Sequence, residues 1–594
     1  MRFVELYKSP VWYDEVVTML MSTGHCVTLP GKIKPDPACN DYPGTDGFVP
    51  ARQLKQYVEF PEHGLKWSSV IRAVQLTDAH PPLYTVAVSS WMQMAGLSVP
   101  NLRIFSVFWN CLTLVFIWLT TRRLAGRRAA FYATTFFWLN PIVLHYAVEG
   151  RSYALLLFLA AGLVWLTLRC HDGGISKGRF AAITTIAASG MMIHYFFFGF
   201  LSGCWLWWLA RPGKSDRKVI LAHCALTMLI PLAWYVSMIR PLLHYDWSGP
   251  GKTFLITLPI WAEFYNPARV FFWQSGIRIS LSQSLLPDLL ELGATLLLLP
   301  IWAVILRRCS PLPKTGALFG FLLAPLMVLG AAPPAINIVK SLTESSQSWL
   351  IATFVLLMIC AIGIYFKMLL HSERVTDKSG KLVALLYVSA LLTPVMPIAT
   401  DILLKLSLMT QARYCLLELV PAAILIGMGC SRLTRTVQLV VPTIWLIIAL
   451  ATFATEIQSN QRSWVNYHEI ATFIDSQDKA LPVISEDHPA VTIGLARELA
   501  NDRLITSWYD EDGTTISNVY SGQLSPTQVI PLINGRSGVI VVHWHAPLRH
   551  NPKVTRLESW LTSHAQLRVS HDSPGATIAV YGPQKGPVFN LTIP

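Results

Sequence analysis

The sequence predicts a polytopic α-helical membrane protein that ends in a smaller α/β domain. Hydrophobic residues make up 53% of the 594 residues and charged residues only 14%, whereas a soluble protein carries about 25% charge. The mean hydropathy is +0.44. Apolar windows of roughly 18–22 residues, each long enough to cross a bilayer, recur along the chain. Helix-like and strand-like segments alternate after residue 457, which indicates a small α/β domain there.

The charge distribution bears on the partners. The formal net charge is +13, which in a soluble protein would point to nucleic acid. In this chain the basic residues fall in short connections between apolar segments, so membrane topology accounts for them. We therefore expect a membrane as the chain's surroundings and no nucleic-acid partner.

The front of the chain, residues 1–98, is expected to form an extracytoplasmic loop with juxtamembrane helices. Residues 1–22 have the pattern of an amphipathic helix start, and residues 23–50 are rich in Pro, Gly and Asp, as loops are. Short surface helices are predicted over 51–60 and 64–76. The apolar spacing of the second is typical of a helix lying flat on a membrane, and it equally fits a helix packed on another domain.

Two cysteines of this front loop can form a disulfide. Cys26 and Cys39 lie in its polar part, and they can pair if the loop faces an oxidising compartment. The other eight of the ten cysteines lie in or beside apolar segments, where cysteine behaves as a small hydrophobe. No CxxC motif or zinc-ligand spacing is present in the sequence.

Residues 99–456 form the predicted transmembrane domain. Its apolar segments lie near 102–121, 129–147, 153–169, 180–193, 195–210, 219–239, 285–306, 316–335, 349–369, 382–400, 412–430 and 436–456. A further apolar segment at 82–96 starts with two prolines and ends at a Gly/Pro break. We expect this segment to be embedded in the interface or re-entrant, without crossing the membrane.

The connections between the spans set the topology. Most Lys and Arg residues fall in alternate connections, among them 122–128, 211–218 and 367–381, and the positive-inside rule places these in the cytoplasm. About twelve spans that start outside then return the chain outside. The front loop and residues 457–594 are thus expected on the periplasmic side of a bacterial inner membrane, provided that 82–96 does not cross. Because this parity leaves the N-terminus outside, we also expect one more span upstream.

The C-terminal region, residues 457–594, is predicted to be an extracytoplasmic α/β domain. Helices are expected over 464–476, 489–500 and 554–564, and strands over 481–485, 538–543, 566–570 and 577–581. No GxGxxG or P-loop pattern occurs in it. We interpret the domain as a lid or an acceptor-docking module.

Polar residues at the predicted outer ends of the spans carry the candidate chemistry. They are Asp14, Glu15, Asp78, His80, Glu149, Arg151, Tyr153, His194 and Arg413. A carboxylate can accept a proton from a hydroxyl, and an arginine can bind two phosphate oxygens at once. Carboxylates beside cations at an apolar boundary therefore suit an anionic, lipid-linked substrate.

Each of these residues also has a structural interpretation. A carboxylate at a helix start can cap that helix, and an arginine at an interface can be a snorkelling anchor. His194 is the hardest to explain structurally, because a polar ring between two closely spaced spans must find partners.

Five motifs in order resemble those of a known superfamily. They are Trp12-Tyr13-Asp14-Glu15, Asp78-Ala79-His80-Pro81-Pro82-Leu83-Tyr84, Asn101-Leu102-Arg103, Glu149-Gly150-Arg151-Ser152-Tyr153-Ala154-Leu155 and Ile193-His194-Tyr195. Together they resemble the bacterial branch of the GT-C membrane glycosyltransferases, the relatives of protein O-mannosyltransferases (glycosyltransferase family 39) and of the lipid A aminoarabinose transferase. The resemblance covers residues 10–200. It is looser at Arg413-Tyr414, and in the C-terminal domain it is only architectural.

The resemblance implies a GT-C fold and a reaction. A sugar would move from a polyprenyl-phosphate donor to an acceptor hydroxyl on a protein, lipid or glycan, with inversion. The implied roles are catalysis for Asp14 and Glu15, phosphate binding for His80, Arg151, Arg413 and Tyr414, and sugar or acceptor binding for Asp78, Glu149, Tyr153 and His194. A divalent metal held by Asp14, Asp78 and Glu149 is an open alternative. Members of the superfamily usually have a span before the acidic pair, which agrees with the parity expectation above.

Two other functions fit the same composition. A transporter or flippase of lipid-linked sugars also needs many spans and cations near a phosphate, but it would place charges near the bilayer midplane. The polar residues here fall at predicted span ends, which favours an enzyme. A surface-glycan polymerase or ligase would differ in using a pyrophosphate-linked donor.

Overall fold

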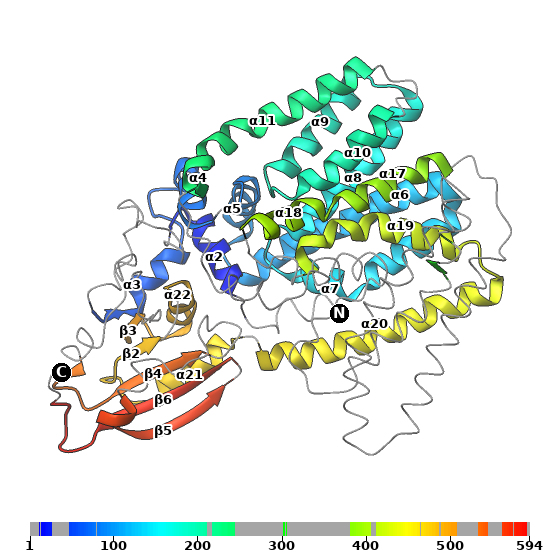
Figure 1. Cartoon of the computed structure of the whole chain (residues 1–594). Coiled ribbons are helices and arrows are strands. Elements are labelled where there is room, and N and C mark those ends of the chain that lie inside the picture. Colours follow the sequence, from blue (N-terminus) through cyan, green and yellow to red (C-terminus); the bar gives the residue numbers. More distant parts are fainter. Residues whose placement is uncertain are drawn as a thin grey trace. The chain divides into compact units, whose positions relative to one another are not determined.

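The chain is represented by a computed structural model, drawn in Figure 1. The structure describes residues 11, 13–26, 47–78, 80–210, 217–243, 301, 302, 305, 380–404, 412–463, 465–485, 489–507, 533–544, 561–573 and 575–590. The chain divides into two compact units. The first, here the helical unit, comprises Met1–Arg2, Ser106–Tyr235 and Gly251–Glu456, and the second, here the sheet unit, comprises Phe3–Phe105, Val236–Pro250 and Ile457–Pro594.

Long apolar helices dominate the helical unit. Its described helices are α6 (Val99–Leu139, which begins in the sheet unit), α7 (Pro141–Val148), α8 (Tyr153–Gly173), α9 (Lys177–Met191), α10 (Phe197–Ala210), α11 (Arg217–Leu243), α17 (Gly380–Leu392), α18 (Val395–Leu404), η6 (Ala412–Glu418), α19 (Leu419–Cys430) and α20 (Arg435–Ser463).

Five helical stretches among the described residues are long and apolar enough to cross a membrane. They are Val99–Leu139, Tyr153–Gly173, Arg217–Met238, Val383–Thr400 and Arg413–Cys430. The prediction of a helical membrane protein is thereby confirmed. The predicted segments 316–335 and 349–369 and nearly all of 285–306 lie outside the described residues, so the count of about twelve spans stays a prediction.

The predicted segment 129–147 is divided between two helices, and the local sequence explains the break. Asn140 precedes a proline, which disfavours the helical conformation, and its backbone is extended with φ −64° and ψ 126°. Its side chain caps α7 by accepting a hydrogen bond of 3.1 Å from the Val143 amide. Upstream, Gly126 interrupts α6 with φ 88° and ψ 179°, a conformation that favours glycine.

Helices of this unit approach closely where they carry glycine. A Cβ atom at Gly203 of α10 would lie 2.5 Å from the Ser389 Cα of α17, and one at Gly427 of α19 would lie 2.4 Å from the Ala129 carbonyl oxygen of α6. Small residues at helix contacts are typical of membrane proteins, because they allow the backbones to come together.

The sheet unit contains a six-stranded mixed sheet with the order β1-β3-β2-β4-β6-β5. The strands are β1 (Val49–Pro50), β2 (Val483–Ser485), β3 (Leu504–Ser507), β4 (Val539–Trp544), β5 (Ala565–Ser573) and β6 (Ala576–Pro583). β2 is parallel to β3 and β4, and the pairs β1–β3, β4–β6 and β5–β6 are antiparallel. The front of the chain thus contributes a strand to the sheet, with Val49 opposite Ile505.

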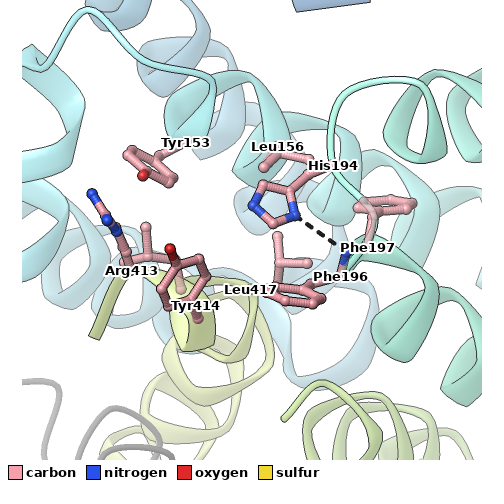
Figure 2. Close-up of a pocket in the computed structure, with 9 residues that line it drawn as sticks. Tyr153, Leu156, His194, Phe196, Phe197, Arg413, Tyr414 and Leu417 are labelled. Carbon is pink, nitrogen blue, oxygen red and sulfur yellow. Dashed lines mark hydrogen bonds between the residues drawn. The ribbon is translucent and has the colours of Figure 1, made fainter. Parts of the chain in front are cut away.

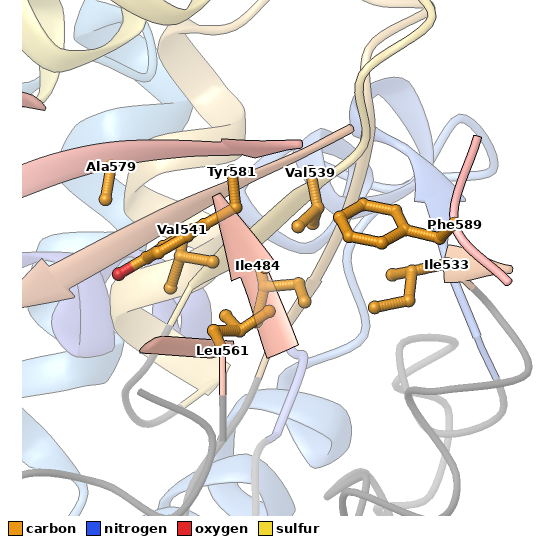
Figure 3. Packing of buried hydrophobic residues seen from close by; sticks show 9 residues of the cluster. Ile484, Ile533, Val539, Val541, Leu561, Ala579, Tyr581 and Phe589 are labelled. Carbon is orange, nitrogen blue, oxygen red and sulfur yellow. The ribbon is translucent and has the colours of Figure 1, made fainter. Parts of the chain in front are cut away.

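Apolar side chains of this sheet form a continuous core (Figure 3). Ile484 of β2, Val541 of β4 and Tyr581 of β6 pack there with Ile533 and Phe589. β4 is buried at all six positions, as the apolar run 538–543 predicts. The predicted strands 481–485, 566–570 and 577–581 correspond to β2, β5 and β6. Only the last residues of the predicted helix 554–564 are described, and they are helical.

The helices described in full within the same unit are α2 (Tyr13–Ser22), α3 (Ala51–Lys55), η3 (Gln56–Val58), α4 (Trp67–Thr77), α5 (Leu83–Ala95), α21 (Tyr467–Ser476) and α22 (Pro489–Glu498). α5 has 13 residues, so it is about 20 Å long against a hydrocarbon core of about 30 Å. That length agrees with the expectation that segment 82–96 does not cross.

The predicted apolar stripe of α4 is divided. Val70 and Val74 are buried, whereas Trp67 and Ile71 are exposed. Each of the two interpretations of this helix therefore accounts for part of its apolar residues. In the adjoining loop, Cys26 is disulfide-bonded; Cys39 lies outside the part of the chain that the structure describes.

Arg503 is a buried cation with a structural role in the sheet unit. Its guanidinium donates to the carbonyl oxygens of Ile474 (2.8 Å), Gln477 (3.1 Å) and Asp478 (2.7 Å). Its Nε lies 3.3 Å from Asp475 Oδ1. The side chain thus links carbonyl groups at and just beyond the end of α21; those of Ile474 and Asp478 also accept the Gln477 and Leu481 amides at 3.1 Å.

We expect Arg503→Met to destabilise the sheet unit by about 3 kcal/mol, because it removes the hydrogen bonds of a buried guanidinium to three carbonyl oxygens and to the Asp475 carboxylate. Hydrogen exchange of the β2 and β4 amides in the detergent-solubilised chain measures this free energy. Lys479→Met is the control, since Lys479 and Asp502 form an exposed pair 3.8 Å apart. Equal exchange rates in the two variants would contradict the structural role.

Candidate functional site

Helix α2 carries the acidic pair in its first turn, with Asp14 and Glu15 as its second and third residues. Most of the helix is buried. Its end is fixed by two hydrogen bonds from elsewhere in the sheet unit. Ser89 Oγ donates to the Ser22 carbonyl oxygen at 2.6 Å, and Thr23 Oγ1 donates to the Tyr57 carbonyl oxygen at 2.9 Å. Asp14 and Glu15 therefore lie on a packed helix and not in a loose loop.

A buried ion pair joins α2 to the first residues of α6. Arg103 Nε donates to Glu15 Oε1 at 2.8 Å, and Arg103 Nη2 donates to Glu15 Oε2 at 2.7 Å. The two side chains are 2% and 0% exposed. Parallel bonds of this kind fix geometry as well as charge. This pairing favours a positioning role for Glu15. The sequence motif contained Arg103, but motif spacing alone gave this residue no partner.

Asp78 and His80 form a second polar pair in this unit. Asp78 ends α4, and its Oδ1 lies 2.6 Å from His80 Nδ1. The same oxygen accepts from the His80 backbone amide at 3.3 Å. A carboxylate on Nδ1 fixes the orientation of the imidazole.

The helical unit contains a pocket, shown in Figure 2. Its lining residues are Tyr153, Leu156, His194, Phe196, Phe197, Arg413, Tyr414, Leu416 and Leu417. Tyr153 is the first residue of α8, His194 lies in the turn between α9 and α10, and Arg413 and Tyr414 belong to η6. Four residues predicted from the sequence, Tyr153, His194, Arg413 and Tyr414, therefore line one pocket.

Hydrogen bonds and ring contacts orient the polar groups of this pocket. His194 Nδ1 accepts from the Phe196 amide at 3.2 Å, which places the ring proton of the neutral imidazole on Nε2. The Arg413 guanidinium lies 5.2 Å from the centre of the Tyr414 ring, within cation–π range. Figure 2 shows the rings of Tyr153 and Tyr414 pointing toward one another beside Arg413, with His194 across from them.

Glu149 and Arg151 lie in the turn before α8. The Arg151 amide donates to the Glu149 carbonyl oxygen at 2.7 Å, and both side chains take part in further interactions. Neither residue lines the pocket. The predicted residues Asp14, Glu15, Asp78 and His80 belong to the sheet unit, whereas Glu149 and Arg151 belong to the helical unit.

The predicted metal ligands are divided in the same way. Asp14 and Asp78 lie in the sheet unit and Glu149 in the helical unit. Within the described ranges, no group of three or more His, Cys, Asp or Glu residues could hold a metal ion. The divalent metal therefore stays an open alternative.

Comparisons with known proteins find similar solved structures. No family model and no curated protein matches the chain. Similar solved structures include ArnT from Cupriavidus metallidurans in the apo state, with a TM-score of 0.40, 13% identity and coverage of 95% of this chain and 96% of that one. ArnT bound to undecaprenyl phosphate gives a TM-score of 0.39 with the same identity and coverage.

A second similar structure is the archaeal oligosaccharyltransferase AglB from Archaeoglobus fulgidus, in complex with an inhibitory peptide and a dolichol-phosphate. Its TM-score is 0.35 and its identity 10%, with 89% of this chain and 69% of that one covered. ArnT and AglB are members of the GT-C superfamily, the one named by the sequence resemblance. A likeness of this degree assigns no residue role, substrate or activity to this chain.

The Glu15–Arg103 pair gives a test of how α2 is held. We expect Arg103→Met to destabilise the chain by about 3–5 kcal/mol, because it leaves a buried carboxylate without its partner. Adding Glu15→Gln should restore part of that loss. Thermal unfolding of both single variants and the double variant in detergent measures the coupling, and purely additive effects would contradict a direct pair.

Proposed function

We propose that this chain is an integral-membrane glycosyltransferase that moves a sugar from a polyprenyl-phosphate donor to an acceptor hydroxyl, with inversion. The main support for this proposal is a single pocket. It is lined by Arg413, His194, Tyr153 and Tyr414, at the ends of apolar helices. An arginine held beside hydroxyl and imidazole donors in so apolar a setting is suited to a phosphate on a lipid.

The pocket binds the donor phosphate. Arg413 supplies two parallel donors and the Tyr414 hydroxyl supplies another. Tyr153 and His194, which the resemblance assigns to the sugar or acceptor, lie beside them and add a hydroxyl and the Nε2–H of the imidazole. When the bond between the sugar C1 and the phosphate oxygen breaks, its electron pair stays on that oxygen. Fixed donors stabilise the charge that develops there. Arg151 and His80 are proposed as further phosphate contacts, and Glu149 and Asp78 as contacts to the sugar or acceptor.

Asp14 is the general base. The acceptor oxygen attacks C1 as the phosphate leaves, and the hydroxyl proton passes to the Asp14 carboxylate. Glu15, fixed by Arg103, holds the start of α2 so that its neighbour keeps one position. The reaction takes place on the extracytoplasmic face, and the acceptor is a protein, a lipid or a glycan. The domain of residues 457–594 serves as a lid or docks the acceptor.

We expect Asp14→Asn to lower sugar transfer by about 100-fold or more while the chain still inserts and folds, because the amide cannot take the proton. The assay uses a short-chain polyprenyl-phosphate sugar in detergent. Glu62→Gln, at an exposed front-loop position, is the control. Activity that survives the change at residue 14 would remove Asp14 from this role.

Arg413→Lys should raise the KM for the donor about tenfold, since lysine offers a single point charge where the guanidinium offers two parallel bonds. Arg435→Lys, at an exposed position at the start of α20, should leave KM unchanged. Donor titration in detergent checks both. Transfer without a sealed compartment would also speak against a transporter, and transfer only from a pyrophosphate-linked donor would favour a polymerase or ligase.

A further inference from the structure

The sheet unit has a cavity of its own, apart from the pocket proposed for sugar transfer. It is lined by Met19, Lys55, Val58, Glu59, Phe60, Leu97 and Arg497, and its volume is about 330 Å³. Ligand sites in proteins start at about this size. Its walls come from α2, from α3 and η3 with the two residues after them, from the α5–α6 connection and from α22.

Two cationic side chains line this cavity, and each has N–H groups that are not used in the hydrogen bonds and ion pairs described here. Lys55 Nζ donates to the Leu499 carbonyl oxygen at 2.7 Å and to Asn501 Oδ1 at 2.8 Å, so one of its three N–H donors is left over. Arg497 Nε lies 4.0 Å from Glu498 Oε1, the guanidinium's one ion pair within the described part of the chain. A guanidinium has five N–H donors, so most of them can donate hydrogen bonds to a bound anion.

Four of the other lining residues are apolar, and one of them lies close to a predicted membrane boundary. Leu97 stands two residues before Val99, where the candidate span of α6 begins. Met94, in the last turn of α5, is 79% exposed. Val58 and Phe60 line the cavity as well, so its lining combines two cations with apolar side chains, which suits the head group of an amphiphile and the start of its chain.

The carboxylate of Glu59 narrows the choice of ligand. It lines the same cavity and is exposed. A purely anionic head group would be repelled by it, whereas a head group that joins a phosphate to an ammonium matches both signs of charge. A primary ammonium can also donate hydrogen bonds to the carboxylate, which a quaternary one cannot.

We propose that this cavity binds the phosphoethanolamine head group of a membrane phospholipid. The phosphate diester lies against Lys55 and Arg497, the ammonium pairs with Glu59, and the first carbons of the lipid pass between Leu97 and Phe60. The site is distinct from the donor pocket, and its occupation does not depend on sugar transfer.

The experiment titrates the detergent-purified full chain with short-chain phosphatidylethanolamine, phosphatidylcholine and phosphatidylglycerol, and with soluble phosphoethanolamine. Native mass spectrometry reads the binding. We expect phosphatidylethanolamine to bind at least tenfold more tightly than the other three ligands. Arg497→Gln should weaken it about tenfold, and Glu59→Gln should remove the preference over phosphatidylglycerol. Lys479→Gln, an exposed position of the same unit, should change nothing.

Unfolding temperatures without lipid test whether the variants fold. The Glu59 side chain is exposed and the Arg497 guanidinium makes an ion pair of only 4.0 Å, so neither substitution should unfold the unit. Equal affinity for all four ligands, or a preference unchanged in both variants, would overturn the proposal. Binding of soluble phosphoethanolamine as tightly as the lipid would assign the cavity to a soluble phosphate compound and would equally overturn it.

Discussion

The ion pair between Glu15 and Arg103 is the constraint on which the front of this protein depends. Removing two charges from water costs several kcal/mol per ion. The two parallel hydrogen bonds of 2.8 and 2.7 Å offset that cost only in one geometry. α2 is therefore fixed against the first residues of a candidate membrane span. Asp14 precedes Glu15 directly, so the pair also holds the backbone position of Asp14.

Much of the architecture could be predicted, because it depends on local sequence patterns such as apolar length and periodicity. Apolar length gave the membrane helices, and the apolar run 538–543 gave β4. The break of segment 129–147 into two helices could also be predicted, since Asn140 precedes a proline. β1 was not predictable. A strand of two residues has no periodicity, and its partner Ile505 lies far along the chain. Contacts between distant segments leave no trace in any one window.

The candidate site shows the same contrast between what local patterns predict and what depends on contacts between distant segments. Motif order selected Tyr153, His194, Arg413 and Tyr414, and the structure brings these four to one pocket. The pairing of Arg103 with Glu15 spans 88 positions and could not be deduced from spacing. The cavity near Arg497 was likewise hidden, because its cations come from α3 and α22, which only the folded sheet unit brings together. Sequence patterns identify chemical groups, and folding decides which of them meet.

The central claim is that the acidic helix belongs to the extracytoplasmic side of the membrane. Thiol labelling tests it most directly, with a cysteine placed at exposed His63 in the front loop and another at exposed Lys177 in the α8–α9 connection. Mass spectrometry locates the label after treatment of intact cells with a membrane-impermeant maleimide. We expect position 63 to react at once and position 177 only after permeabilisation. The reverse pattern would place Asp14 in the cytoplasm and contradict its proposed role.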